Sequence, residues 1–293
     1  MNRSTIMPEL PEVESVRRVL LDRLTGLSVH SVEVIRSDVI KLIKHPRSSL
    51  GSAIDHRQLL VGGSIKDVIR HGKRLALVVH DGRILEFGLG MSGLLRFEEA
   101  GSTGEEELHE HVRWDLKGVG GGAAGKLIWK DPRRFGSITP VGSWKALTQV
   151  QWAHLGPDAL KISEAEFISR IRAGSSAIKV RLLNQQVVAG IGNIYADEAL
   201  FRAGIRPRRA ANRTSPARLA QLRRVAIEIL REAISAGGSS IRTHLDPEGR
   251  SGRFQEAHAV YGRQNEPCVR CGEVIRTCSL GGRTTAWCVR CQK

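Results

Sequence analysis

Residues 268–291 read CVRCGEVIRTCSLGGRTTAWCVRC, and this stretch decides the architecture of the C-terminal end of the chain. It contains two Cys-x2-Cys pairs, Cys268 with Cys271 and Cys288 with Cys291, and sixteen residues separate the pairs. Cysteine pairs at this spacing are typical of a tetrahedral Zn²⁺ site with four thiolate ligands, which leaves no coordination position for water. The spacing therefore predicts a small zinc finger with one structural Zn²⁺.

The fifth cysteine, Cys278, lies outside this spacing and is expected to be a free thiol on the hairpin that joins the two pairs. All five cysteines fall within the last 26 residues, whereas a secreted disulfide scaffold distributes its cysteines through a short chain. The same region carries Arg276, Arg283 and Arg290, which a zinc ribbon can present to a phosphate backbone.

The charge of the chain points to a polyanionic partner. The 293 residues carry a formal net charge of +15, and nucleic acid is the first partner to consider for such a surplus. The surplus is concentrated, because residues 202–232 hold nine Arg against two Glu, and guanidinium groups favour phosphate recognition. Aromatic residues make up 4% of the chain, which argues against extensive stacking on single strands and favours a duplex.

The pattern of apolar residues excludes two classes of protein. No apolar run approaches the ~20 residues needed to span a bilayer, so no membrane association is expected. Residues 1–6 lack the apolar core of a secretory signal. A hydrophobic content of 41% over 293 residues fits a globular protein with one large domain or two ordinary ones.

The N-terminal half combines one helix with short strands. Apolar residues recur at helical spacing over 8–24, with acidic residues in the first turn, as the helix dipole favours. From about residue 27 to 140, short β-branched and leucine-rich runs alternate with Gly and Asp, which predicts an antiparallel sandwich or barrel. The predicted strands include 28–35, 64–69, 74–79, 83–87 and 126–129, and a Gly-rich hairpin loop is expected at 118–125.

The C-terminal half is predicted to be helical up to the zinc finger. Helices are expected over 163–173, 176–185, 193–204 and 215–236, the last with Ser215 as its N-cap and a Gly pair at its end. A polar, Gly-rich loop follows at 239–261. The predicted fold class is therefore α+β with two domains: an N-terminal helix plus an antiparallel β-sandwich, then a helical domain that ends in the zinc finger.

Near the N-terminus, MPELPE at residues 7–12 allows two interpretations. Proline and acidic residues are common at the start of a helix, where a missing N–H costs nothing. If translation instead begins at Met7 and that residue is removed, Pro8 becomes an N-terminal secondary amine that can form an iminium with an aldehyde. If Met1 is retained, the Pro8 nitrogen is an amide and has no such reactivity.

Three glycine-containing turns are candidates for contacts with DNA. GIGNIY at 190–195 lies between two predicted helices, where main-chain N–H groups can face an anion. DPRRFG at 131–136 carries two cations and an aromatic residue, and GLGMSG at 88–93 carries a methionine at its tip. Each pattern alone is also compatible with an ordinary turn, but together they indicate apolar and guanidinium wedges that enter a duplex.

Taken together, these motifs resemble those of the formamidopyrimidine-DNA glycosylases, bacterial base-excision enzymes that remove oxidised purines. The resemblance covers residues 7–293, with motifs in the family's order at 8–14, 72–73, 89–93, 131–136, 190–200, 260–263 and 268–291. It implies a helix–two-turn–helix domain before the zinc finger, damaged double-stranded DNA as the partner, and Zn²⁺ as the cofactor. It also implies a monomer without an obligate protein partner, in the bacterial cytoplasm and associated with the nucleoid.

The domains implied by the resemblance follow the motifs. Residues 7–150 correspond to the catalytic domain, 151–262 to the helix–two-turn–helix domain and 263–293 to the zinc finger. Within the second domain, residues 239–254 resemble the loop that folds over the extruded base. Residues 1–6 are expected to be a dispensable extension.

The resemblance implies catalytic roles for four residues. Pro8 is similar to the N-terminal nucleophile that attacks C1′ of the damaged nucleoside and forms a Schiff base. Glu9 is similar to the general acid that protonates the sugar as its ring opens. Lys73 is similar to a phosphate-contacting lysine that donates a proton in β-elimination. Arg283 matches the zinc-finger arginine that holds a phosphate beside the lesion and is linked to δ-elimination.

Six further residues match positions that bind DNA in the family. Met91, Arg133 and Phe135 are similar to the three side chains that fill the void left by a flipped base, with Arg133 facing the orphaned cytosine. The other three match contacts to phosphates or elsewhere on the DNA backbone, and they are Asn193, Lys179 and His109.

The sequence departs from the family's pattern at three places. Residues 1–6 precede the usual start and would block Pro8 if they were retained. Gly88 stands where relatives often have His, and Gly174 stands where they often have a backbone-contacting Lys. No catalytic residue is lost, so we expect the chain to start at Met7 and that Met to be removed.

Two alternatives stay open. An endonuclease VIII-like enzyme would act on oxidised pyrimidines, although Leu10-Pro11 and the long loop at 239–254 favour the purine branch. A non-catalytic lesion-binding protein would bind duplexes in a salt-dependent way without cleaving them. This second alternative gains weight if residues 1–6 stay attached.

Overall fold

The computed structural model describes residues 7–41, 55–102, 108–239 and 246–293, so the predicted extension at 1–6 lies outside the described residues. The chain divides into two compact units. Unit 1 comprises Met1–Pro8, Glu12–Ala153 and Ser240–Gly252, and unit 2 comprises Glu9–Pro11, His154–Ser239 and Arg253–Lys293.

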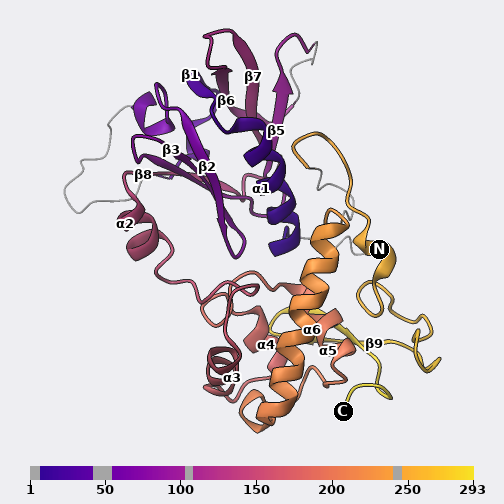
Figure 1. Ribbon diagram of the computed structural model, residues 1–293. Helices are drawn as coiled ribbons and strands as arrows, with labels where there is room; N and C mark the ends of the chain where they lie inside the picture. The colour runs from indigo at the N-terminus through magenta and orange to yellow at the C-terminus, as the bar shows by residue number, and fades with distance from the viewer. Residues whose placement is uncertain (1–6, 42–54, 103–107, 240–245) are drawn as a thin grey trace. The chain divides into compact units, whose positions relative to one another are not determined.

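Unit 1 contains two antiparallel four-stranded sheets, which confirm the predicted β-sandwich (Figure 1). The first sheet has the order β1-β6-β7-β5, formed by β1 (Ser28–Val34), β6 (Glu110–Lys117), β7 (Ala123–Lys130) and β5 (Leu94–Glu99). The second has the order β2-β3-β4-β8, formed by β2 (Ile65–His71), β3 (Arg74–Val79), β4 (Ile84–Gly88) and β8 (Ser137–Val141). The predicted loop at 118–125 is shorter than expected, because β7 already begins at Ala123.

The core of unit 1 contains aromatic side chains from both sheets. Phe87 of β4 contacts Trp114 of β6 edge-on, with ring centroids 6.0 Å apart, and lies 5.7 Å from the ring of Trp129 of β7. All three side chains are buried. Because each aromatic side chain removes a large apolar area from water, these contacts hold the two layers of the sandwich together.

Helix α1 (Leu10–Leu24) is amphipathic, as the sequence pattern predicts. Val13, Val16 and Leu20 are fully buried and belong to the same hydrophobic core as the sheets. Burial of an aliphatic side chain of this size contributes about 1.5–3 kcal/mol relative to exposure. Apolar packing therefore fixes α1 beside the sandwich.

Unit 2 is helical, with a zinc-finger hairpin at its end. Its helices are α3 (Glu164–Arg172), α4 (Ile178–Leu183), α5 (Asn193–Arg202) and α6 (Pro216–Ser235). Helix α6 packs against α3 and α5 (Figure 1). Ser215 caps α6 as predicted, because its hydroxyl accepts a hydrogen bond from the Arg218 N–H and Pro216 occupies the first turn.

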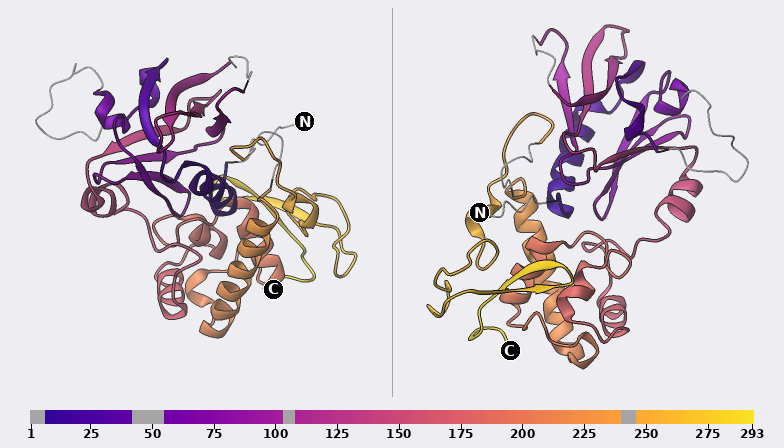
Figure 2. Two further views of the ribbon diagram at one scale, coloured as in Figure 1. Left: turned by 45° about the horizontal axis from the view of Figure 1, so that its top comes forward. Right: turned by 180° about the vertical axis from the view of Figure 1, so that it is seen from behind.

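The hairpin of the finger consists of β9 (Arg276–Leu280) and β10 (Arg283–Trp287), joined through Gly281 and Gly282. Both glycines have positive φ values, of 57° and 72°, as a two-residue turn of this kind requires. Strand β10 packs against α5, and the hairpin is drawn in yellow in Figure 2.

Shorter elements complete the described chain. Unit 1 also contains a one-turn helix α2 (Trp144–Ala146) that continues into a π-helical turn at Leu147–Gln151. The 3₁₀ turns lie at Ser37–Val39, His56–Leu59, Ala211–Arg213 and Phe254–Ala257. Among the described residues, no helix combines the length and the apolar character needed to cross a membrane.

Glu14 links α1 to the second sheet. Its carboxylate accepts hydrogen bonds from Arg17 at 2.8 Å and from Arg70 of β2 at 2.9 Å. Burial alone would raise the pKa of Glu14, but the hydrogen bonds and charges of Arg17 and Arg70 outweigh burial and lower the pKa to about 2. Arg70 also donates to the carbonyl of Gly72 at 2.9 Å, so the link extends to the β2–β3 turn that carries Lys73.

Replacing Glu14 by Gln should destabilise the fold at neutral pH but not in acid. A carboxyl group whose pKa is depressed stabilises the folded state above its ordinary pKa of 4.5, and this stabilisation is lost as the pH falls toward 2. We expect Glu14→Gln to reduce the free energy of unfolding by about 1 kcal/mol at pH 7, allowing for solvent screening. Denaturation at pH 7, 5 and 3 measures this difference, and a difference that does not change with pH would contradict the role of the charge.

Candidate functional site

The predicted site residues are divided between the two units. Unit 1 contains Pro8, Lys73, Met91, His109, Arg133 and Phe135. Unit 2 contains Glu9, Lys179, Asn193, Arg283 and the four cysteines of the CxxC pairs. The contacts within each unit show which of these residues lie together.

Glu9 is held at the N-terminus of α5. Its buried carboxylate accepts hydrogen bonds from the backbone N–H groups of Ile194 at 2.9 Å and Tyr195 at 3.5 Å. The first N–H groups of a helix have no partner inside the helix and lie at the positive end of its dipole, so they bind a carboxylate well. The carboxylate that directly follows Pro8 in the chain therefore has a fixed position.

Gly190 allows Leu10, the residue after Glu9, to lie close to the turn before α5. Its φ of +114° lies in the region that favours glycine, and an added Cβ would lie 2.5 Å from Cδ1 of Leu10. The backbone N–H of Leu10 donates to the Gly190 carbonyl at 3.1 Å. The turn at 190–195 thus places helix N–H groups against an anion, as its sequence indicates, and that anion is Glu9 of the same chain.

Lys179 is placed differently from what the resemblance implies. Its ammonium group is fully buried, 2.7 Å from the Asp197 carboxylate, and donates to the backbone carbonyl of Thr284 at 3.1 Å. Burial lowers the pKa of Lys179 and raises that of Asp197 to about 7, in each case against the attraction of the partner. In this structure the Lys179 ammonium therefore contacts the zinc-finger hairpin and is not exposed to solvent.

Asn193 and Asp197 hold the same hairpin. The Asn193 side-chain amide donates to the Thr284 carbonyl at 3.0 Å, and the Asp197 carboxylate accepts from the Ala286 N–H at 3.0 Å. Arg283 precedes these residues at the start of β10, and its side chain is exposed. The structure therefore brings Asn193 and Lys179 to the strand that carries Arg283, while the guanidinium itself faces solvent.

Two acidic residues of this site were missed in the sequence. Asp197 and Glu198 are buried in α5, and Glu198 accepts hydrogen bonds from the backbone N–H groups of residues 259–261 at 2.8–2.9 Å. Burial is the largest influence on Glu198, and it raises the pKa of this carboxyl despite the three hydrogen bonds. The available signal is a pair of adjacent acids inside a helix whose other residues from Ile194 to Phe201 are apolar or aromatic.

The four cysteines of the CxxC pairs form one cluster, as their spacing predicts. Their sulfur atoms all lie within 4.8 Å of one another, with 3.9 Å between Cys268 and Cys291 and 3.5 Å between Cys271 and Cys288. A tetrahedral site with Zn–S bonds of about 2.3 Å requires sulfur separations of about 3.8 Å. The donor set therefore fits one structural Zn²⁺, whereas Cys278 lies on β9 outside the cluster.

In unit 1 the turns that carry Met91, Arg133 and Phe135 lie against each other. Gly90 has a φ of +61°, and an added Cβ there would lie 2.5 Å from the carbonyl carbon of Phe135. Ser92 donates to the buried Asp131 carboxylate and accepts from the Arg133 N–H at 3.2 Å. The Arg133 guanidinium lies 4.7 Å from the centre of the Phe135 ring, and 57% of the Phe135 surface is exposed. An exposed cation on an exposed aromatic ring fits a wedge better than a core contact.

The other three predicted residues of unit 1 lie outside the two turns that carry Met91, Arg133 and Phe135, and they are Pro8, Lys73 and His109. Pro8 is buried at the start of the described chain. Lys73 is half-buried in the β2–β3 turn that Arg70 holds. His109 is exposed immediately before β6, with a φ of +73°, and its carbonyl accepts from the Asp131 N–H at 3.1 Å.

Arginine side chains occupy the space beside the two glycines that depart from the family's pattern. An added Cβ at Gly88 would overlap the guanidinium of Arg74, which pairs with Glu86 at 3.4 Å. An added Cβ at Gly174 would lie 3.0 Å from Cζ of Arg181. Each glycine therefore leaves room for a neighbouring guanidinium.

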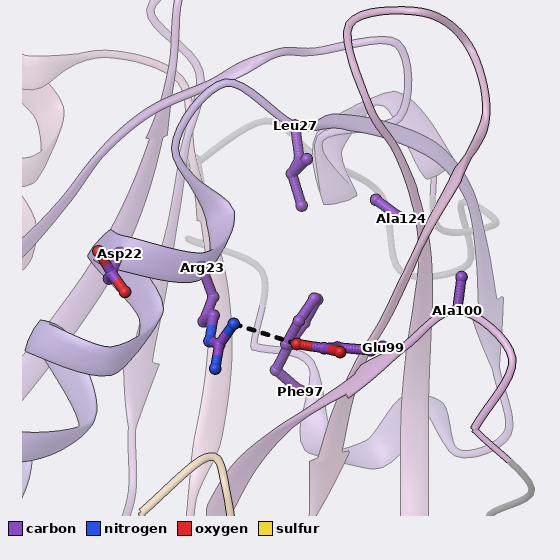
Figure 3. Close-up of a pocket in the computed structure, with 7 residues that line it drawn as sticks. All are labelled: Asp22, Arg23, Leu27, Phe97, Glu99, Ala100 and Ala124. Atoms are coloured by element: carbon purple, nitrogen blue, oxygen red, sulfur yellow. Dashed lines mark hydrogen bonds and ion pairs between the residues drawn. The ribbon is translucent and has the colours of Figure 1, made fainter.

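A separate pocket lies beside the end of α1 in unit 1 (Figure 3). It is lined by Asp22, Arg23, Leu27, Phe97, Glu99, Ala100 and Ala124. Arg23 pairs with Glu99 at 3.0 Å and with Glu248 at 2.7 Å, and the Phe97 N–H donates to the Pro247 carbonyl at 3.0 Å. The pocket contains none of the predicted site residues, but its contacts hold the C-terminal part of the predicted loop at 239–254, of which 240–245 lie outside the described residues.

Zinc should be present at one ion per chain, and its removal should release the hairpin that carries Arg283. Cys271→Ser should lower the zinc content measured by mass spectrometry and the protection of residues 276–287 in hydrogen exchange, because metal binding and folding of such modules are coupled. Cys278→Ser is the matched control and should retain both. Full zinc content in Cys271→Ser would contradict the four-thiolate site.

Comparisons with known proteins agree with these features. Three family models match the chain: the formamidopyrimidine-DNA glycosylase N-terminal domain at residues 7–138, the formamidopyrimidine-DNA glycosylase H2TH domain at 155–245, and a zinc finger found in FPG and IleRS at 265–293. The chain is 40% identical to the formamidopyrimidine-DNA glycosylase of Bdellovibrio bacteriovorus and 35% identical to that of Bacillus licheniformis. Both matches cover 98% of this chain and 100% of the relative.

Solved structures show the same fold. A variant of Lactococcus lactis FPG in complex with DNA that contains Fapy-dG has a TM-score of 0.84 and 34% identity, and Lactococcus lactis Fpg in complex with abasic-site DNA has a TM-score of 0.83 and 33% identity. Each covers 98% of this chain and 100% of the solved chain. By sequence, by fold and by its zinc-finger cysteines, this chain belongs to the formamidopyrimidine-DNA glycosylase family.

Proposed function

We propose that this protein is a base-excision repair enzyme that removes 8-oxoguanine and formamidopyrimidines from duplex DNA and then cleaves the resulting abasic site. The observation that carries this proposal is the Glu9 carboxylate, fixed by the N-terminus of α5 directly after Pro8. A nucleophilic amine with an adjacent, positioned carboxyl group is the arrangement that amine-based covalent catalysis requires.

The chemistry starts with the amine of Pro8. Its lone pair attacks C1′ of the damaged nucleoside, the C1′–N bond to the base breaks, and the base leaves with that electron pair and takes up the proton that the Pro8 nitrogen loses. Glu9 transfers a proton to O4′ as the sugar ring opens, which gives an iminium between Pro8 and C1′. Loss of a proton from C2′ then breaks the C3′–O3′ bond and releases the 3′ phosphate, and loss of a proton from C4′ breaks the C5′–O5′ bond and releases the 5′ phosphate. Water hydrolyses the remaining iminium, which frees the sugar fragment and restores the Pro8 amine. The product is a one-nucleotide gap with phosphates at both ends.

DNA binding is divided between the two units. In unit 2 the exposed Arg283 binds a phosphate beside the lesion and Asn193 shares this work, while Lys179 holds the strand that carries Arg283. In unit 1 Arg133 and Phe135, with Met91 on the adjacent turn, fill the void left by the flipped base. Contacts of this kind support salt-dependent binding to damaged duplex DNA.

Lys73 and His109 complete the proposed site. The half-buried position of Lys73 in a turn held by Arg70 supports a role in which its ammonium contacts phosphate and donates a proton during elimination. The exposure of His109 supports a contact with the DNA backbone. The domain limits, the monomeric state and the association with the bacterial nucleoid stay predictions.

Activity should require a free amine on Pro8. The N-terminal family model begins to match at residue 7, which supports Met7 as the start of the active enzyme. Protein expressed from Met7 should lose that Met, whereas a form that retains residues 1–6 should bind lesion-containing duplexes but show no base release, because its Pro8 nitrogen is an amide. Intact mass and a single-turnover cleavage assay on both forms check this. Equal cleavage by the two forms would contradict Pro8 as the nucleophile and favour another amine.

The preferred lesion distinguishes a glycosylase for oxidised purines from an endonuclease VIII-like enzyme for oxidised pyrimidines. We expect cleavage of 8-oxoguanine paired with cytosine to be at least about tenfold faster than cleavage of thymine glycol, a difference of about 1.4 kcal/mol in barrier height. The opposite order would make the chain an endonuclease VIII-like enzyme. This alternative deserves the test, because one solved complex of Lactococcus lactis FPG contains DNA with an oxidised pyrimidine.

A further inference from the structure

His258 is a buried histidine that the proposed chemistry does not use. It lies in unit 2, 8% exposed, between two aromatic rings: its ring centroid is 5.8 Å from that of Phe254 and 5.6 Å from that of Tyr261. Its Nε2 atom is 3.0 Å from the hydroxyl of Ser239, which is itself buried. A buried polar side chain in an aromatic cluster is costly unless its hydrogen bonds are satisfied, so this contact requires an explanation.

The hydrogen bonds continue from Ser239 to the helix that holds Glu9. The Ser239 hydroxyl lies 3.3 Å from the hydroxyl of Tyr195, which is 1% exposed. The backbone N–H of the same Tyr195 donates to the Glu9 carboxylate at 3.5 Å. A continuous line of contacts therefore runs from His258 through Ser239 and Tyr195 to Glu9.

The direction of these hydrogen bonds follows from the proton count. Ser239 has one hydroxyl proton and Tyr195 has one, so in an ordered chain each donates once. The ring of His258 also forms a hydrogen bond with the backbone of Tyr261, and this bond raises the pKa of His258. A backbone group that favours the protonated ring is a carbonyl that accepts from a ring N–H. Burial nevertheless lowers the pKa of His258 to about 4, so the ring is neutral at pH 7. The consistent arrangement has Nδ1 protonated and Nε2 free to accept.

We infer that His258 is a positioning residue for base excision. Its Nε2 accepts a hydrogen bond from the Ser239 hydroxyl, and that hydroxyl accepts a hydrogen bond from the Tyr195 hydroxyl. These two hydrogen bonds fix the first turn of α5, which holds Glu9. The aromatic rings around the chain exclude water, so hydrogen bonds inside it are not exchanged for solvent. Phe254 belongs to this enclosure, since its ring lies 5.8 Å from that of Tyr195. His258 does not touch the reacting atoms and acts through Ser239 and Tyr195.

Backbone hydrogen bonds beside Ser239 connect this series of side-chain hydrogen bonds with the predicted base-covering loop. The Phe254 N–H donates to the Gly238 carbonyl at 3.0 Å, and the Arg253 N–H donates to the Ala236 carbonyl at 2.9 Å. These bonds join the two described ends of the predicted base-covering loop beside Ser239. Loss of the His258 contact should therefore disturb two features that serve base release in the proposed function. These are the position of Glu9, which donates the proton, and the position of Ser239, where the predicted loop begins.

The inference rests on the proposed function and predicts a selective loss. Base release needs Glu9 to protonate the sugar, whereas a preformed abasic site already has an accessible aldehyde. We expect His258→Leu to slow release of 8-oxoguanine about fivefold to tenfold, the loss expected for one buried hydrogen bond, and to leave cleavage of a preformed abasic site within about twofold. His258→Gln keeps an acceptor near the position of Nε2 and should restore most of the base release.

The test measures both reactions under single-turnover conditions for the full chain with Pro8 at its N-terminus. Ser239→Ala should reproduce the slower release of 8-oxoguanine. The double variant with His258→Leu should be no slower than either single variant, because both substitutions break the same series of hydrogen bonds. His80→Leu, at an exposed histidine of unit 1, is the matched control and should leave both reactions unchanged. An equal fall in both reactions, additive effects in the double variant, or no fall at all would overturn the inference.

A measurement on the unaltered protein keeps the inference testable if the variants do not fold. The ¹⁵N chemical shifts of the His258 ring at pH 7 should show a neutral ring with the proton on Nδ1 and a hydrogen-bonded Nε2. A proton on Nε2, or a charged ring, would overturn the inference. Failure of the proposed function is distinguishable, because the unaltered enzyme would then release no 8-oxoguanine.

Discussion

The binding of Glu9 by the N-terminus of α5 is the interaction on which the candidate site depends. The same helix also holds other parts of unit 2: Asp197 holds β10 next to Arg283, and Glu198 holds the backbone of residues 259–261. The side chains of Asp197 and Glu198 are buried, so each carboxylate must be hydrogen-bonded to groups of the protein. These hydrogen bonds restrict the positions that the bonded backbone segments can take. Helix α5 therefore acts as a rigid support for the proposed catalytic carboxyl group of Glu9 and for the strand that carries Arg283.

The surplus of positive charge is less available to DNA than the composition indicates. Within the arginine-rich stretch at 202–232, Arg202 pairs with Glu232 at 2.7 Å. Arg218 donates to the carbonyls of Gly204 and Lys293, and Arg223 donates to that of Ile162. Guanidinium groups satisfy several buried or half-buried carbonyls at once, so part of an arginine-rich sequence serves the fold itself. In the proposed site the phosphate contact is therefore assigned to an exposed guanidinium, that of Arg283.

Much of the fold, and part of the site, could be predicted from the sequence because the signals are local. The period of α1, the Ser-Pro cap of α6 and the CxxC spacing each depend on residues that are close in the chain, and the structure confirms all three. The position of Lys179 could not be predicted in this way, because it depends on the distant residues Asp197 and Thr284. The same holds for His258 and Ser239, and for the arginine that lies beside Gly88. Partners of buried polar groups are set by tertiary contacts, which leave no periodic pattern in the sequence.

In the proposed reaction Pro8 is the residue that becomes covalently bound to the sugar. The most direct measurement is reduction with borohydride during cleavage of an 8-oxoguanine duplex, followed by peptide mapping of the trapped complex by mass spectrometry. We expect the sugar fragment to be attached to the N-terminal amine of a peptide that begins with Pro8. Attachment to the side chain of a lysine such as Lys73, or a trapped complex whose protein still begins with Met1, would contradict it.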